Sequence, residues 1–66
     1  MQIEVNGRRR RVTDGASLAE LVASVVHRDD GVAVAVNRSV VPRSRWVNHV
    51  LSGGDQIEII QAVGGG

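Results

Sequence analysis

The groups that could take part in chemistry are few in this 66-residue chain. It contains no cysteine, and all eight of its basic residues are arginine. Thiol nucleophiles, disulfides, thiolate metal sites, Schiff-base amines and phosphate-binding loops that use a lysine are therefore excluded. The unusual feature is the end of the sequence, Ala62-Val63-Gly64-Gly65-Gly66. Because glycine has no Cβ, this end can enter a passage only one backbone wide; the alternative is a frayed end.

The other polar candidates are weaker. His27 and Arg28 follow a predicted helix, where positive charge suits the helix C-terminus, and no second metal ligand accompanies His27 nearby in the sequence. Asp29 and Asp30 stand beside Gly31, which is typical of a solvated turn rather than of acid–base or metal chemistry. We therefore expect neither a metal site nor a catalytic base in this segment.

Four consecutive arginines, Arg8, Arg9, Arg10 and Arg11, are the strongest charge feature. The run could be a charged edge strand that prevents sheet-to-sheet aggregation, a surface for an acidic protein partner, or a phosphate patch for nucleic acid. A net charge of only +1 and a single aromatic residue argue against nucleic acid. The edge strand is the preferred interpretation, and contact with a partner is left open.

The elements that must position the end of the chain begin with a hairpin. Residues 2–5 alternate polar and apolar, and Asn6-Gly7 is the dipeptide that best suits a type I′ turn. The second strand, residues 8–13, should direct two of its arginines toward the face that Ile3 occupies. Their stems would then lie along the edge of the core while the guanidinium groups stay in water.

A helix of about ten residues is predicted next. Ser17 and Glu20 have the spacing of a capping box, in which the two side chains satisfy amide donors of the first turn. The apolar residues that then recur with helical spacing are Leu18, Leu21, Val22 and Val25. One stripe of this helix should therefore face the sheet.

The middle of the sequence predicts a central strand and a short edge strand. Residues 32–36 are apolar on both faces, which is typical of a strand covered by a helix on at least one side. Pro42 limits Val40-Val41 to an edge or an end, since proline cannot donate to the ladder. We expect Ser44 to cap a short helical turn. Trp46 should close one end of the core, with a partner-facing role as its alternative.

A final strand is predicted at residues 56–61, after a glycine-rich turn. Alternation places Ile57 and Ile59 on one face of this strand, and Glu58 and Ile60 on the other. Ile60 is therefore expected to be an exposed apolar residue close to the glycine end. Clustered residues of this kind mark docking surfaces.

Together with the glycine end, this order of elements resembles the β-grasp (ubiquitin-like) fold, an α+β class with a mixed sheet of four to five strands and one main helix packed on one face. The residues that sharpen the resemblance to the ThiS family of sulfur carriers in thiamin biosynthesis are Asn37, Val41-Pro42-Arg43, Trp46, Gly54 to Ile59, and Ala62 to Gly66. They span essentially the whole chain. We expect a single domain, residues 1–61, and a flexible tail, residues 62–66, that ends in diglycine.

The resemblance implies chemistry on the main-chain carboxylate of Gly66. In the family, an adenylating (E1-like) enzyme uses ATP and magnesium to form a C-terminal acyl-adenylate. A sulfur donor such as a cysteine desulfurase then yields a thiocarboxylate, which thiazole synthase consumes. The chain itself would bind no cofactor and would be carrier and substrate, not an enzyme. The residues implied to thread a partner's channel are Gly65 and Gly64, and those implied to dock are Ile60, Ala62 and Val63.

Three alternatives stay open. The first is another β-grasp sulfur carrier, such as the small subunit of molybdopterin synthase. The second is a ubiquitin-like modifier joined through Gly66 to target lysines, and the third is an arginine-patch binding module with an inert tail. Since no apolar run reaches about 18 residues and no signal-peptide pattern opens the sequence, we expect a cytoplasmic protein that does not bind a membrane. We also expect a monomer and, from the low net charge and the single aromatic residue, no binding of nucleic acid.

Overall fold

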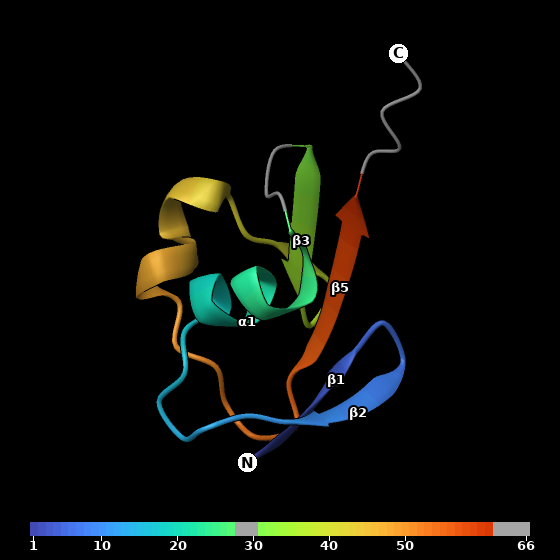
Figure 1. Ribbon diagram of the computed structural model, residues 1–66, viewed down its shortest axis with the longest axis vertical. Coiled ribbons are helices and arrows are strands. Elements are labelled where there is room, and N and C mark those ends of the chain that lie inside the picture. The colour runs from blue at the N-terminus through green and yellow to red at the C-terminus, as the bar shows by residue number, and fades with distance from the viewer. Residues whose placement is uncertain (28–30, 62–66) are drawn as a thin grey trace.

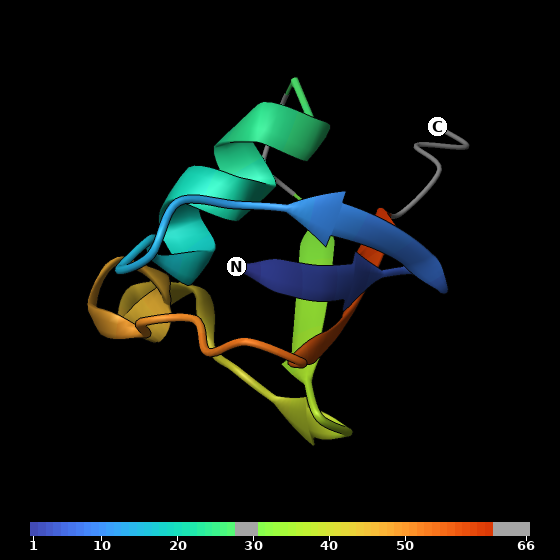
Figure 2. The ribbon, with the colours of Figure 1, turned by 90° about the horizontal axis from the view of Figure 1, so that it is seen from below.

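The computed structural model describes residues 1–27 and 31–61 of the chain. Within them, a five-stranded sheet has the strand order β2-β1-β5-β3-β4. The helix α1 and the 3-10 helix η1 lie on the same side of this sheet (Figures 1 and 2). The bounds of the elements are β1 Gln2–Val5, β2 Arg8–Arg11, α1 Leu18–Val25, β3 Val32–Val36, β4 Ser39–Val40, η1 Arg43–Asn48 and β5 Gln56–Gln61.

The sheet is mixed, as predicted. β1 and β5 run parallel, whereas β1 with β2, β3 with β4 and β3 with β5 are antiparallel. One main helix covers one face, which confirms the expected α+β class for the part of the chain that the structure describes. The predictions for Arg28, Asp29 and Asp30, and those for residues 62–66, lie outside that part.

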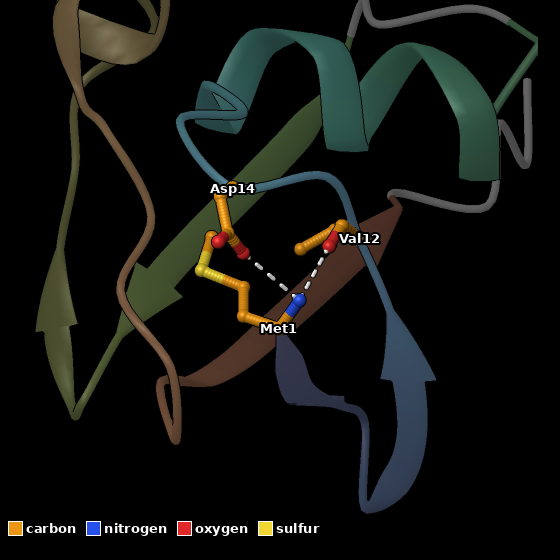
Figure 3. Close-up of polar contacts among 3 residues, drawn as sticks. All are labelled: Met1, Val12 and Asp14. Atoms are coloured by element: carbon orange, nitrogen blue, oxygen red, sulfur yellow. Dashed lines mark hydrogen bonds and ion pairs between the residues drawn. The ribbon is translucent and has the colours of Figure 1, made fainter.

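The first hairpin forms as its sequence predicts. Asn6 and Gly7 both have positive φ, 51° and 81°, which is the requirement of a type I′ turn. β2 is shorter than expected and ends at Arg11, although the next residue still bonds to β1's side of the hairpin, with the Val12 amide 2.9 Å from the Met1 carbonyl. The Met1 amino group donates to the Val12 carbonyl at 2.8 Å and contacts the exposed Asp14 carboxylate at 3.1 Å (Figure 3).

The helix α1 begins at the predicted capping box. The Ser17 hydroxyl accepts from the Glu20 amide at 3.1 Å and lies 3.3 Å from the Glu20 carboxylate. The helix ends at Val25, because Val26 is extended (φ −119°, ψ 145°), a conformation that suits a β-branched residue. His27 therefore lies beyond the last turn, and the prediction that it serves the helix C-terminus is wrong.

The core fills the space between α1, η1 and the covered face of the sheet. Its members are Ile3, Val5, Leu18, Leu21, Val22, Val34, Val36, Val41, Trp46, Leu51, Ile57 and Ile59. Val25, predicted to belong to the helix stripe, is 38% exposed and lies at the rim.

The segment after Pro42 closes one end of the core. Trp46 is only 4% exposed, and its indole Nε1 donates to the Val41 carbonyl at 2.8 Å, so the predicted closing role is confirmed and the partner-facing alternative is not supported. The prediction for Ser44 is wrong. η1 already begins at Arg43, directly after Pro42 with its fixed φ of −59°, and no side chain in the described part of the chain caps it.

Candidate functional site

The candidate site is the end of β5, the strand that leads to the glycine segment. Ile57 and Ile59 face the core, whereas Glu58 and Ile60 face away from it, and Ile60 is 64% exposed. The predicted exposure of Ile60 is therefore confirmed. The docking and threading roles of Ala62, Val63, Gly64, Gly65 and Gly66 fall outside the residues that the structure describes, so they stay predictions.

Ile60 belongs to a larger apolar surface on the side of the sheet opposite α1. The register pairs Ile60 with Ala33, and Ala35 with both Glu58 and Val40. Ala33 and Val40 are exposed, Val40 at 76%, and Ala35 is half-buried. We call the surface formed by Ala33, Ala35, Val40 and Ile60 the open-face patch. Its two central residues are alanines, whose side chains are short. The larger side chains of Val40 and Ile60 lie at its two ends.

The sequence revealed Ile60 but not the rest of this patch. The signal was present in β3, where larger valines alternate with Ala33 and Ala35. Alternation by size indicates that the valine face is packed and the alanine face is not. Only the register shows that this alanine face lies beside Ile60.

Asn6 fixes the end of β5, a role that sequence reasoning missed because Asn6 was explained as a turn residue. Its main-chain amide donates to the Ile57 carbonyl at 2.9 Å. Its side chain accepts from the Ile59 amide at 2.8 Å and donates to the Ile59 carbonyl at 3.1 Å. The Asn6 side chain thus continues the ladder of β5 after β1 has turned away.

Asn37 does the same for the start of β5, from the other side. Its main-chain amide donates to the Gln56 carbonyl at 2.8 Å, and its side-chain oxygen accepts from the Gln56 amide at 2.9 Å. Its side-chain nitrogen also donates to the Asp55 carboxylate at 3.0 Å. Both asparagines have a φ near +50°, which few other residues tolerate. β5 is therefore held at both ends.

The described site provides a hydrogen-bonded strand beside a surface of exposed apolar side chains. Within residues 1–27 and 31–61, no three His, Cys, Asp or Glu side chains come together as metal ligands. In the same residues, every buried side-chain nitrogen and oxygen has a hydrogen-bond partner. None of the helices described is long and apolar enough to cross a membrane. The exposed Val40 and Ile60 side chains are the feature of this site that suits protein binding.

Comparison with known proteins adds the family. Residues 3–66 match the sequence model of the ThiS family. The sulfur carrier protein ThiS of Escherichia coli K12 is 36% identical over 66 residues, and the alignment covers all of both chains. A thiazole synthase of Magnetococcus marinus is 35% identical over 66 residues, which are the whole of this chain and 20% of that protein.

Solved structures agree with the fold. The crystal structure of the thiamine biosynthesis protein ThiS from Geobacter metallireducens superposes with a TM-score of 0.84 at 28% identity, and the match covers both chains completely. A solution structure of a thiamine biosynthesis protein from the same organism gives a TM-score of 0.81 at 28% identity, over 100% of this chain and 88% of that one. These likenesses confirm the predicted β-grasp class.

Proposed function

The chain belongs to the ThiS family, and we therefore propose that it is a sulfur carrier of thiamin biosynthesis that holds sulfur as a thiocarboxylate on Gly66. The observation that carries the proposal is the family match, which runs through the glycine segment to residue 66. The sequence supports the same site, because it offers no cysteine on which sulfur could be held. The chain acts as carrier and substrate, and the catalysis belongs to its partners.

The proposed chemistry takes place at one carboxylate. A carboxylate is a poor electrophile, so an adenylating partner with ATP and magnesium first joins it to the α-phosphate and releases pyrophosphate. A sulfur nucleophile supplied by a donor such as a cysteine desulfurase then attacks the carbonyl carbon. AMP leaves with one former carboxylate oxygen. When the attacking sulfur is the outer sulfur of a persulfide, a thiol of a partner then attacks the S–S bond, which leaves the thiocarboxylate on Gly66 and a disulfide on the donor side. The net result at Gly66 is the exchange of oxygen for sulfur.

The geometry of the site supports delivery of this end to a partner. β5 is held by Asn6 and Asn37 and pairs with β3 as far as Gln61, so the last described residue has a defined position on the domain. Five extended residues reach at most roughly 17 Å, at about 3.3–3.6 Å per residue. That length allows Gly66 to enter a buried active site while the domain stays outside it.

The open-face patch is the proposed docking surface for the partners. It consists of four apolar residues beside the exposed Glu58 of the same face, and Ile60 belongs to the strand that leads to Gly66. The proposed partners are the adenylating enzyme and thiazole synthase. The second of these is supported by the thiazole synthase of M. marinus, in which a segment similar to this chain is part of the enzyme itself. A carrier that works beside thiazole synthase fits that arrangement.

The test is the intact mass of the protein after incubation with ATP, magnesium, an adenylating partner and a sulfur source. We expect the mass to rise by the difference between one sulfur and one oxygen. An unchanged mass would contradict the proposal, and isopeptide adducts on lysines of other proteins would indicate a modifier instead.

The threading part of the proposal has its own variant, Gly65→Val. A branched Cβ should block passage through a channel one backbone wide, so adenylation should be lost. The circular dichroism spectrum and the urea midpoint should stay as in the parent protein, because the core lies in residues 1–61. A normal yield of thiocarboxylate from this variant would contradict threading.

A further inference from the structure

A second surface of the molecule lies along β2, at the edge of the sheet. In the described part of the chain β2 pairs with β1 alone, so its other side faces solvent. All four of its residues are arginines and all four are exposed. The sulfur-carrier chemistry proposed for Gly66 makes no use of this edge.

The backbone of β2 presents free hydrogen-bonding groups at two known positions. Met1 and Val12 exchange both of their main-chain hydrogen bonds, at 2.8 and 2.9 Å, and therefore form a hydrogen-bonded pair of the antiparallel ladder. Such pairs alternate with non-bonded ones along a ladder. The register then makes Gln2–Arg11 and Glu4–Arg9 the non-bonded pairs. The amide and carbonyl groups of Arg9 and Arg11 consequently point outward from the sheet.

The side chains of β2 put positive charge on both faces of this edge. Arg8 and Arg10 stand opposite the buried Val5 and Ile3, on the side of α1, and Arg10 donates to the Ser24 hydroxyl at 3.0 Å. Arg9 and Arg11 lie on the opposite face of the sheet. Within the described residues, none of the four arginines forms an ion pair with a carboxylate.

We propose that β2 binds an acidic, extended segment of a partner protein, which adds to the sheet as a further strand. The outward groups of Arg9 and Arg11 would give the main-chain hydrogen bonds, and arginines on both faces would select Asp and Glu side chains. A second copy of this chain is rejected, because pairing β2 with β2 would bring eight arginines together. The same charge that prevents self-association therefore selects an acidic partner.

A protein partner fits this edge better than nucleic acid does. The net charge of the whole chain is only +1, so its long-range field for a polyanion is weak. Single-stranded nucleic acid binds largely by stacking on aromatic side chains. The one aromatic residue of the sequence, Trp46, is only 4% exposed. Its indole ring is therefore not accessible for stacking with a base.

The first test measures amide hydrogen exchange by NMR in the presence of a short peptide in which Glu-Glu pairs alternate with Val-Val pairs, so that an added strand carries Glu on both of its faces. Exchange of the Arg9 and Arg11 amides should slow on binding, while the Arg8 and Arg10 amides, already bonded to β1, should change little. A peptide with Lys in place of Glu should not bind. Binding of the acidic peptide without slower exchange at Arg9 and Arg11, or no binding at all, would overturn the proposal, as would equal binding of single-stranded DNA.

The second test uses a matched pair of variants, Arg9→Gln and Arg9→Pro. It separates the contribution of the main-chain hydrogen bond from that of the side-chain charge. Both remove one charge, but only proline removes the outward amide donor, and it leaves the ladder to β1 intact. Loss of one exposed charge contact should weaken binding by about fivefold or less, and the proline variant should bind more weakly still. Equal affinities of the two variants would exclude strand addition. A chain without Gly66 should bind the peptide normally, so this proposal can fail or hold independently of the sulfur chemistry.

Discussion

Ile57 and Ile60 have the same side chain and stand three residues apart on β5, yet their exposed fractions are 1% and 64%. The alternation of the strand alone produces this difference, because it turns Ile57 toward α1 and Ile60 toward the open face. Ile57 removes apolar surface from water within the chain, and Ile60 can do so only against another molecule. The two faces of β5 therefore separate stability from binding, and the following variants test that separation.

The largest expected effect is the truncation of the buried isoleucine. Ile57→Ala should lower the free energy of unfolding by about 2–5 kcal/mol, because it removes three buried carbons and leaves a cavity. Ile60→Ala should change it by less than about 0.5 kcal/mol. Urea unfolding followed by circular dichroism measures both values. If Ile57→Ala does not fold, Ile57→Val replaces it, with an expected loss of about 0.5–1.5 kcal/mol. Similar losses at positions 57 and 60 would contradict the separation.

The next-largest effect on stability is expected at Asn6, whose side chain forms two hydrogen bonds to Ile59 of β5. Asn6→Gly keeps the positive φ of the turn but removes both side-chain hydrogen bonds to Ile59, whose amide is then left without a partner. We expect a loss of about 1–3 kcal/mol. Faster exchange should be concentrated at the Ile59 amide, where NMR can detect it.

Asn37→Gly is the matched control for Asn6→Gly, since it makes the same chemical change at the other end of the strand. Its hydrogen bonds to Asp55 and Gln56 are solvent-exposed, so the loss should be smaller, about 0.5–1.5 kcal/mol. The faster exchange should now appear at the Gln56 amide. If both variants speed exchange equally along the whole of β5, then Asn6 and Asn37 do not each stabilise only their own part of the strand.

Sequence patterns predicted the elements of this fold well, because each depends on neighbours along the chain. The Asn6-Gly7 turn, the Ser17–Glu20 capping box and the alternation in β5 are all local signals, and all three are confirmed. The capping role of Ser44 failed because η1 starts at Arg43, directly after Pro42, which is two residues earlier than a cap at Ser44 would allow.

The parts that could not be predicted depend on contacts between distant segments. The hydrogen bonds from Asn6 to Ile59 span 53 positions of sequence, and a turn residue gives no sign of them. The open-face patch likewise needs the pairing of Ala33 with Ile60, which is a matter of register. The composition of the sequence showed what chemistry the chain lacks, and only the register shows that the alanine face of β3 lies beside Ile60.

An effect on stability of similar size is expected at the helix that covers the buried face of β5. Ser17→Ala removes the cap of α1 and should lower the free energy of unfolding by about 0.5–2 kcal/mol. Affinity for an adenylating partner should be unchanged once the protein is fully folded, because α1 lies on the other side of the sheet from the open-face patch. A weaker complex at temperatures where the variant is fully folded would show that the two faces are coupled.

Ile60→Asp is expected to have the smallest effect on stability. It is also expected to have the largest effect on binding. The free energy of unfolding should change by less than about 0.5 kcal/mol, since the side chain is mostly in water. Affinity for the adenylating partner, measured by calorimetric titration, should fall by about tenfold or more if Ile60 is buried on docking.

Val47→Asp is the control for Ile60→Asp, because Val47 is similarly exposed, at 67%, but belongs to η1 on the side of α1. Both variants introduce one negative charge in place of one exposed aliphatic side chain, so any general effect of charge should be common to both. The difference in their affinities for the partner therefore isolates the open face. Unchanged affinity in Ile60→Asp would remove Ile60 from the interface, and equal losses in both variants would attribute the effect to charge alone.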